Sequence, residues 1–218
     1  FGYGSGAGGK VSITNLVSNA GVVATDTAGV GTARSMIAAC GYGGDKGIFG
    51  YGYVAPAVSM SNLVSNAGVV ATDTAGVGTA RRNLAACEYG EDKGIFGFGY
   101  LASYLGVTNL VSNAGVVATD TAGVGQVRDG PAACSYGEDK GIFGYGQWDG
   151  VSTKITNLVS NAGVVASDTA GVGTARDMLA ATQYDGDKGI FGYGYVQPSS
   201  VVSMTNLVSN AGVVATDV

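Results

Sequence analysis

The sequence predicts an all-β repeat protein, and three observations support this prediction. The segment 45–52, Asp-Lys-Gly-Ile-Phe-Gly-Tyr-Gly, returns almost unchanged at 92–99, 139–146 and 187–194, and its last four residues also open the chain. Glycine occupies 39 of 218 positions against 3 prolines, without the Gly-X-Y period of collagen, and a hydrophobic content of 46% argues against disorder. No 3.6-residue apolar period indicates a helix, so turn-rich β structure is expected.

A second motif gives the length of the repeat. Asn-Leu-Val-Ser-Asn-Ala-Gly-Val-Val-Ala occurs five times without change, starting at positions 15, 62, 109, 157 and 206, so successive copies lie 47 to 49 residues apart. Repeats of this length with several short strands are typical of β-propeller blades. We therefore expect one β-propeller domain, with a partial unit at 1–33 and complete units, each starting at an arginine, at 34–80, 81–127, 128–175 and 176–218.

The unit 34–80 shows which strands are expected. Its hydrophobic runs and turn residues predict four antiparallel strands, at 34–40, 46–53, 58–66 and 69–74. Alternation along the second strand would place Phe49, Tyr51 and Tyr53 on one face. Because the segment 1–33 begins at a second strand, the prediction is a five-bladed β-propeller of four-stranded antiparallel blades whose first blade lacks one strand.

The order of features in each unit resembles the kelch-type β-propeller repeat, and the resemblance covers the whole chain. An arginine, an alanine-rich strand, a turn, an Ile-Phe-Gly-Tyr-Gly strand, a variable loop and two further strands follow one another. Gly-Tyr-Gly replaces the Gly-Gly of a kelch unit, and Val69-Val70-Ala71 stands where the last strand would carry tryptophan. The chain therefore looks like a distant, glycine-rich relative, similar to phage and environmental proteins. The resemblance implies a fold and no particular activity.

The units differ most in the segment between their second and third strands. These segments vary in length and chemistry and lie at 5–10, 53–57, 100–106, 147–154 and 195–201. The pair of residues after each repeat arginine also varies, and up-and-down strand order places both variable sets on one rim. A rigid scaffold with variable loops on one face is typical of binding proteins. The candidate ligand-binding residues on this rim are Tyr53, Tyr100, Tyr104, Trp148, Asp149 and Tyr195.

Aromatic rings beside polar groups suit sugar or peptide ligands. The function we expect is therefore non-catalytic, lectin-like recognition of a glycan or a cell-surface receptor by an extracellular or virion-surface protein. The alternative is a structural assembly module with no small-molecule ligand. A partner would touch the variable rim in the first case and the blade edges in the second. Loop drift without selection would also produce the variation.

Composition argues against several other functions. A net charge of −5 and a pI near 4.5 disfavour nucleic acid as a partner. No apolar run reaches the roughly 18 residues that a membrane helix needs, so no membrane insertion is expected. The chain has no histidine, which excludes Ser-His-Asp and Cys-His mechanisms and removes the commonest metal ligand. We expect no enzymatic activity, no cofactor and no metal site.

Several repeated features have structural interpretations that we prefer to functional ones. The Asp-Lys pairs, such as Asp45-Lys46, are interpreted as charged turns, because adjacent strand residues would point to opposite faces. One aspartate per unit is too few for calcium, so these carboxylates are expected to pair with the repeat arginine or to cap a turn. The run 4–10 fits a phosphate loop or a dinucleotide fingerprint only in part, because Val11 stands in place of Ser or Thr and begins a strand.

Cys40, Cys87 and Cys134 occupy one equivalent position in three units, on the predicted first strand. Equivalent sites on neighbouring blades should lie too far apart for a disulfide, which tolerates roughly 7 Å between Cα atoms. They are expected to be small buried thiols near the axis.

The missing first strand creates a problem of closure. In propellers the first strand lines the central channel, so its absence would leave apolar groups and backbone in a gap. We expect the gap to be filled by residues of a parent chain upstream of Phe1, by a strand from another copy in a homo-oligomer, or by a rearranged blade.

Overall fold

The structure is a computed structural model that describes residues 1–218, and its secondary structure consists only of β-strands. The prediction of an all-β chain is therefore confirmed. No helix suited in length and hydropathy to crossing a membrane is present. The strands are β1 (Gly2–Gly6), β2 (Gly9–Thr14), β3 (Ala38–Tyr42), β4 (Lys46–Gly50), β5 (Ser61–Val64), β6 (Ala85–Tyr89), β7 (Lys93–Tyr100), β8 (Tyr104–Val111), β9 (Ala132–Tyr136), β10 (Lys140–Gly144), β11 (Gln147–Trp148), β12 (Val151–Ser152), β13 (Thr156–Val159), β14 (Ala180–Tyr184), β15 (Lys188–Gly192), β16 (Tyr195–Val196), β17 (Ser200–Val201) and β18 (Thr205–Val208).

Each unit that starts at an arginine contains one three-stranded antiparallel sheet. The strand orders are β3-β4-β5, β6-β7-β8, β9-β10-β13 and β14-β15-β18. The segment 1–33 contributes the hairpin β1-β2, and two further short hairpins, β11-β12 and β16-β17, extend from the last two units.

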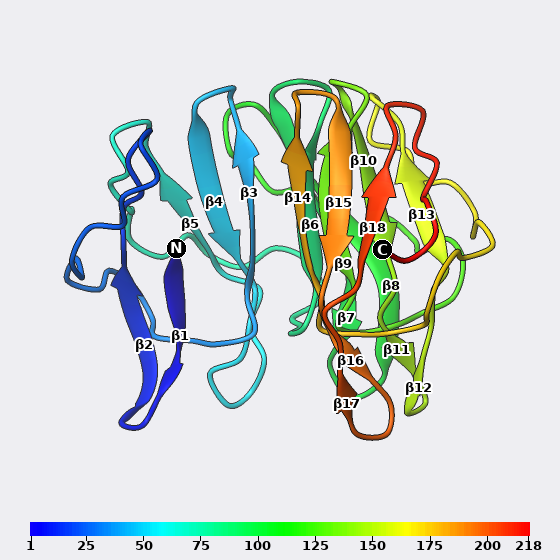
Figure 1. Ribbon diagram of the computed structural model, residues 1–218. Helices are drawn as coiled ribbons and strands as arrows, with labels where there is room; N and C mark the ends of the chain where they lie inside the picture. Colours follow the sequence, from blue (N-terminus) through cyan, green and yellow to red (C-terminus); the bar gives the residue numbers. More distant parts are fainter.

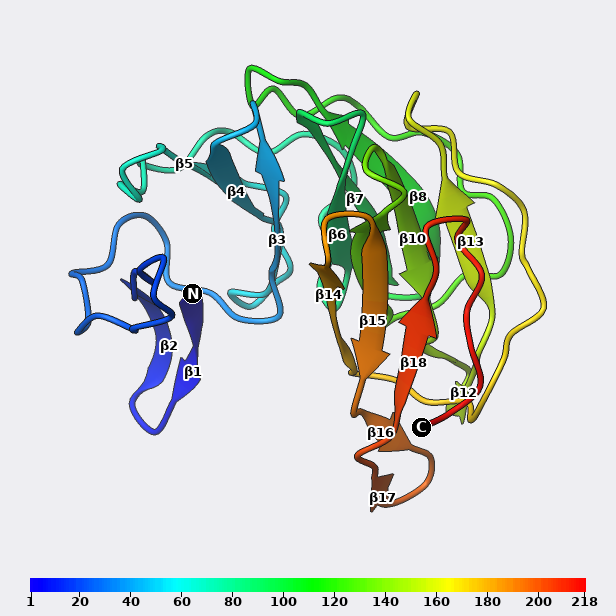
Figure 2. The same ribbon diagram turned by 45° about the horizontal axis from the view of Figure 1, so that its top comes forward.

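The sheets are arranged like a fan (Figures 1 and 2). Their first strands, β3, β6, β9 and β14, lie side by side in that order. All four contribute residues to one cavity of 380 Å³. The hairpin β1-β2 and the sheet β14-β15-β18 stand at the two ends of the fan, and no hydrogen bond joins them. The structure therefore shows a fan of antiparallel sheets and no closed ring.

The fourth strand predicted for each unit does not form as a regular strand. In the unit 34–80, the segment 69–74 makes only two isolated bridges to β5. The side-chain amide of Asn62 donates to the Ala71 carbonyl at 3.0 Å and to Asp73 Oδ1 at 2.9 Å, so a side chain occupies one backbone acceptor that a regular ladder would use. Each sheet has three strands and an irregular outer segment.

The second strand of the unit is bent, which changes the faces on which its aromatic rings lie. Tyr51 has a φ of 60°, so β4 ends one residue before it and not at the end of the predicted strand 46–53. Phe49 packs against Tyr3 of the preceding unit, whereas Tyr51 packs against Phe96 of the following unit. The prediction that Phe49 and Tyr51 share a face is wrong, because a positive φ interrupts the two-residue alternation.

Neighbouring units are joined by an aromatic contact above a glycine. At all four junctions two rings meet edge to face with centroids 5.2 Å apart, in the pairs Tyr3–Phe49, Tyr51–Phe96, Phe98–Phe143 and Tyr145–Phe191. A Cβ added at Gly97 would lie 2.7 Å from the ring of Phe143, so only glycine allows this approach. Each hydrophobic cluster combines residues from two adjacent units, since a single unit cannot bury both of its faces.

A buried arginine completes each junction. The guanidinium of Arg81 lies 4.1 Å from the ring centroid of Tyr51 in the preceding unit. It donates to the Phe98 carbonyl at 2.8 Å and to Asn109 Oδ1 at 2.7 Å, and the Asn109 amide donates to Asp120 at 2.8 Å. A chain of ring, guanidinium, amide and carboxylate therefore crosses the junction. The fully buried arginines at equivalent positions are Arg34, Arg81, Arg128 and Arg176.

Arg128 differs from the other three because Phe98 replaces tyrosine beneath it. Its guanidinium lies 3.8 Å from the Phe98 ring centroid, and its buried Nε has no hydrogen-bond partner. Burial lowers the pKa of Arg128 to about 10. The side chain therefore stays charged at neutral pH.

The predicted pairing of the repeat aspartates with the arginines is confirmed in two of the four units that carry an arginine. Arg34 lies 3.7 Å from Asp73, and Arg176 lies 3.5 Å from Asp217. Burial opposes ionisation of Asp73, but hydrogen bonds from Thr32 and Asn62 outweigh it, so the pKa of Asp73 lies below its usual value. The pKa values of Asp120 and Asp217 are lowered in the same way.

The glycine beneath each ring can be tested with a matched pair of variants. Gly97→Ala should destabilise the protein by about 1 to 3 kcal/mol, because the new methyl group meets the ring of Phe143. Gly192→Ala, at the equivalent site of the last unit, adds a methyl group whose nearest neighbour is Thr205 at 3.4 Å. It should change the free energy of unfolding by less than about 1 kcal/mol. Urea unfolding measures both, and equal losses would contradict the account of the junction.

The repeat aspartates predict an acid dependence of stability. Because the folded-state pKa of Asp120 is lowered, its contribution is present at neutral pH and is lost as pH falls through that pKa. Asp120→Asn should lower the free energy of unfolding at pH 7 by about 1 to 2 kcal/mol, and the difference should shrink below about pH 4. Asp26→Asn is the control, since Asp26 accepts a side-chain hydrogen bond from Asn15 but, unlike Asp120, none from a threonine. A pH-independent loss in the Asp120 variant would count against this assignment.

Candidate functional site

The variable loops emerge together from one edge of the fan, which is the lower edge in Figure 1. The hairpins β11-β12 and β16-β17, the tip between β7 and β8, the turn of β1-β2 and the loop after β4 all point there. We refer to this edge as the variable rim. The six sequence-predicted site residues lie on these loops: Tyr53, Tyr100, Tyr104, Trp148, Asp149 and Tyr195.

The structure brings only some of these six side chains together. Tyr100 and Tyr104 face each other across the β7-β8 hairpin, edge to face, with ring centroids 5.3 Å apart. Trp148 is 45% exposed on the β11-β12 hairpin, and Asp149 is exposed at its turn. No aromatic contact joins Trp148 or Tyr195 to another ring. The rim therefore presents separate aromatic groups on neighbouring loops.

Arg82 links two of the loops, and sequence reasoning did not assign it to the site. Its guanidinium lies 4.7 Å from the ring centroid of Tyr53 and 5.2 Å from that of Tyr100. The ammonium group of Lys10, in the segment 1–33, lies 5.0 Å from the ring centroid of Tyr53. Such contacts hold the rings in place and add positive charge to the rim. The only sequence signal for Arg82 was its position in the variable pair after a repeat arginine.

Two buried aspartates lie beneath the variable rim, also within these variable pairs. Asp129 is 5% exposed and Asp177 is 0% exposed, and the Oδ1 atom of each has no hydrogen-bond partner. The Oδ2 atom of Asp129 accepts from Asn83 at 3.2 Å, and that of Asp177 accepts from Gln197 at 3.1 Å. Each carboxylate therefore keeps one free acceptor at the base of the rim.

The two aspartates come from adjacent units and interact electrostatically. The residues that follow them are hydrogen-bonded directly, since the Met178 amide donates to the Gly130 carbonyl at 2.9 Å. Burial raises the pKa of Asp129, and the neighbouring charge of Asp177 acts in the same direction. An unpaired buried acceptor costs stability, and such sites often serve a function or hold ordered water.

The chemistry available at the rim is recognition through stacking and hydrogen bonding. Exposed rings can stack on apolar faces of a ligand, Arg82 can donate hydrogen bonds, and the aspartates can accept them. No group of three or more His, Cys, Asp or Glu side chains has the arrangement of a metal site. The two aspartates alone supply fewer oxygen ligands than calcium takes.

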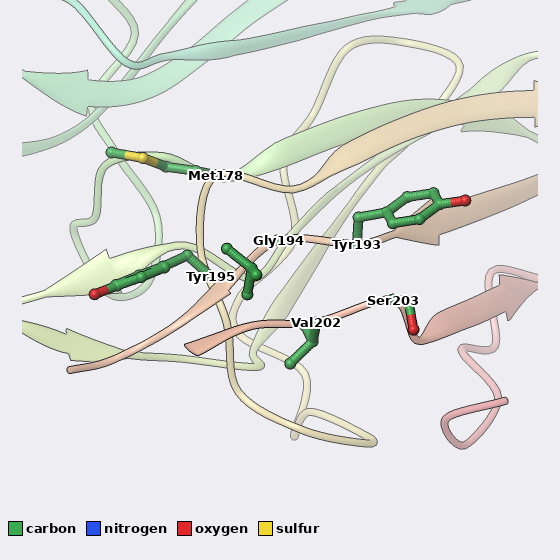
Figure 3. A pocket seen from close by; sticks show the side chains of 7 residues that line it. Met178, Tyr193, Gly194, Tyr195, Val202 and Ser203 are labelled. Atoms are coloured by element: carbon green, nitrogen blue, oxygen red, sulfur yellow. The ribbon is translucent and has the colours of Figure 1, made fainter. Parts of the chain in front are cut away.

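A large open cavity of 650 Å³ lies beside the rim, at the end of the fan (Figure 3). Five of its seven lining residues are hydrophobic, and Tyr195 is the one sequence-predicted site residue among them. Tyr193 and Tyr195 lie on one segment with Gly194 between them, and Val202 lies on the segment opposite. All seven lining residues belong to the unit 176–218.

The remaining candidates from the sequence have structural roles. The run 4–10 forms the β1-β2 hairpin and precedes no helix, as expected. The three cysteines are free, and burial raises the pKa of Cys40 and of Cys134 to about 12, so these thiols stay protonated at neutral pH. The interpretation of Asp45-Lys46 as a charged turn before a strand is confirmed, although the two side chains contact each other at 3.1 Å and do not point apart. Asp45 lies in the turn before β4, where strand alternation does not apply.

No protein-family model and no curated protein matches the chain.

Because one oxygen of its buried carboxylate has no hydrogen-bond partner, Asp129 is expected to reduce the stability of the protein. Because burial raises the folded-state pKa of Asp129, the protein loses stability as pH rises through that value. Asp129→Asn should therefore raise the free energy of unfolding at pH 7 by up to about 1 kcal/mol, and the gain should vanish below about pH 4. Asp149→Asn, at an exposed turn, is the control and should change nothing measurable. A destabilised Asp129 variant at pH 7 would show that the charge is compensated.

Proposed function

We propose that the chain is a non-catalytic binding module of the β-propeller type, in which five units act as blades and the variable rim recognises the ligand. The observation that supports this proposal most strongly is the separation of constant from variable residues. The ring, guanidinium, amide and carboxylate contacts recur from junction to junction, whereas every loop that changes in length and chemistry emerges at one edge. Binding proteins are commonly built in this way. The kelch-type resemblance of the sequence agrees with the blade architecture.

The proposed ligand is a glycan or a cell-surface receptor. Sugars present apolar faces that stack on aromatic rings and hydroxyl groups that pair with carboxylates. Trp148 beside Asp149, the Tyr100–Tyr104 pair, and Tyr195 supply these groups on separate loops, together with Tyr53 held by Arg82. A net charge of −5 disfavours a polyanion such as nucleic acid. An extracellular or virion-surface location would suit this role, which needs no cofactor and no catalytic residue.

A second candidate function is assembly, in which blade edges and not the rim contact a partner. The observation that favours it is the apolar surface at the last unit, where Tyr193 is 63% exposed although its equivalents Tyr51 and Tyr145 are buried.

Trp148 provides the test of the rim. The wild-type protein should bind a subset of glycans on an array, and Trp148→Ala should bind the same glycans roughly fivefold more weakly, as loss of about 1 kcal/mol of stacking implies. The free energy of unfolding should not change, because the side chain lies on an exposed hairpin.

Val151→Ala is the matched control, since Val151 is exposed and pairs with Trp148 in the same hairpin. It should bind like the wild type. Absence of any glycan signal for the wild type, or unchanged affinity of the Trp148 variant, would refute glycan recognition by this rim.

A further inference from the structure

Most of the positive charges in the protein have a structural partner, and the exceptions lie in the variable parts of the units. The chain contains 11 lysines and arginines. The four repeat arginines are buried at the junctions. Four lysines, each the first residue of the middle strand of a sheet, form salt bridges with neighbouring aspartates. The cations outside these two groups, which form no salt bridge, are Lys10, Arg82 and Lys154.

Two of these three cations lie on tyrosine rings of the variable rim. The Arg82 guanidinium lies 4.7 Å from the ring centroid of Tyr53 and 5.2 Å from that of Tyr100, and the Lys10 ammonium lies 5.0 Å from the Tyr53 ring. Tyr104 continues the series, since its ring meets Tyr100 at 5.3 Å. We call these five residues the aromatic row. They come from three adjacent units, so the row crosses two junctions.

The aromatic row holds Arg82 in place without using its hydrogen-bond donors. A guanidinium carries five N–H donors, and contact with a ring occupies its flat face. The Arg82 side chain is half-buried and donates no hydrogen bond within the protein. Its backbone is fixed by two hydrogen bonds with Tyr100, at 2.9 and 3.0 Å. The guanidinium is therefore oriented in advance and its donors are free for a ligand.

The charges on the rim are divided between the units. Arg82 and Lys10 make the aromatic row positive. At the position equivalent to Arg82 the two following units carry Asp129 and Asp177, and Asp149 lies exposed on the hairpin between them in sequence. Asp129 attracts Arg82 electrostatically but forms no salt bridge with it. A ligand with one anionic group would therefore be oriented with that group toward the aromatic row.

We propose that the aromatic row binds an acidic sugar, whose carboxylate or sulfate ester accepts hydrogen bonds from the Arg82 guanidinium while its ring contacts the neighbouring tyrosines. This inference rests on the proposed function and names the class of glycan that the rim recognises. Both anions offer the pair of oxygens that fits the fork of a guanidinium. A single anionic group also meets less repulsion than a polyanion from a protein of net charge −5.

Pairs of glycans that differ in one charged group test the inference. One series compares glycans that end in a sugar carboxylate with their carboxyl-reduced forms, and the other compares sulfated glycans with their desulfated forms. The wild type should bind the acidic members of one series at least about tenfold more tightly, as charge-assisted hydrogen bonds imply. The series that shows this difference identifies the anion. The difference should shrink as ionic strength rises.

Three variants separate recognition by Arg82 from a general effect of charge. Arg82→Gln and Lys154→Gln change the net charge equally, but no ring contacts Lys154. Arg82→Gln should bind acidic and neutral glycans alike, whereas Lys154→Gln should keep the preference of the wild type. Arg82→Lys keeps the charge without the fork and should retain only part of the preference. Urea unfolding of each variant checks that the fold is intact.

The possible results distinguish this inference from the proposed function. Equal binding of acidic and neutral glycans by the wild type would overturn the inference and leave glycan recognition in place. Equal losses in Arg82→Gln and Lys154→Gln would also overturn it, because the preference would then follow net charge and not the aromatic row. Absence of glycan binding by the wild type would overturn both.

Discussion

The structure depends on a guanidinium that is buried between two units. Burying a charge is costly unless it is paired, and each repeat arginine is paired with a ring of one unit and with an asparagine of the next. All but Arg128 also donate to a backbone carbonyl of that next unit. The planar, forked guanidinium can satisfy all these partners at once, which a lysine ammonium cannot. The arginine therefore fixes the angle and distance between sheets, and the aromatic contact over glycine follows from that placement.

This arrangement explains why the conserved and variable parts of the units separate so clearly. The buried rings and arginines of each unit contact a neighbouring unit, so a substitution at one of them requires a matching substitution in that neighbour. The hairpins at the rim contact few other units, so their length is free to change. Asp129 and Asp177 stand at the border between these regions, which is why they combine burial with incomplete hydrogen bonding.

Much of the architecture followed from the spacing of identical residues. The repeat length and two of the pairings of arginine with aspartate needed no coordinates, because five copies of one motif show which positions are equivalent. The face on which Tyr51 lies was not predictable from alternation, since a positive φ at that residue reverses it. The predicted outer strand is irregular because the side chain of Asn62 binds a backbone carbonyl that a regular strand would use. The contact of Arg82 with Tyr53 and Tyr100 depends on how close two loops approach, which no local pattern records.

The near-identity of the junctions has a consequence for how such a chain changes in evolution. Because all four aromatic pairs meet at the same 5.2 Å spacing, any unit fits beside any other. Unequal recombination between the repeated gene segments can therefore delete or duplicate a whole unit without creating a mismatched surface. The number of units is under weaker structural constraint than the sequence of each, and rim loops can be reordered together with the units that carry them.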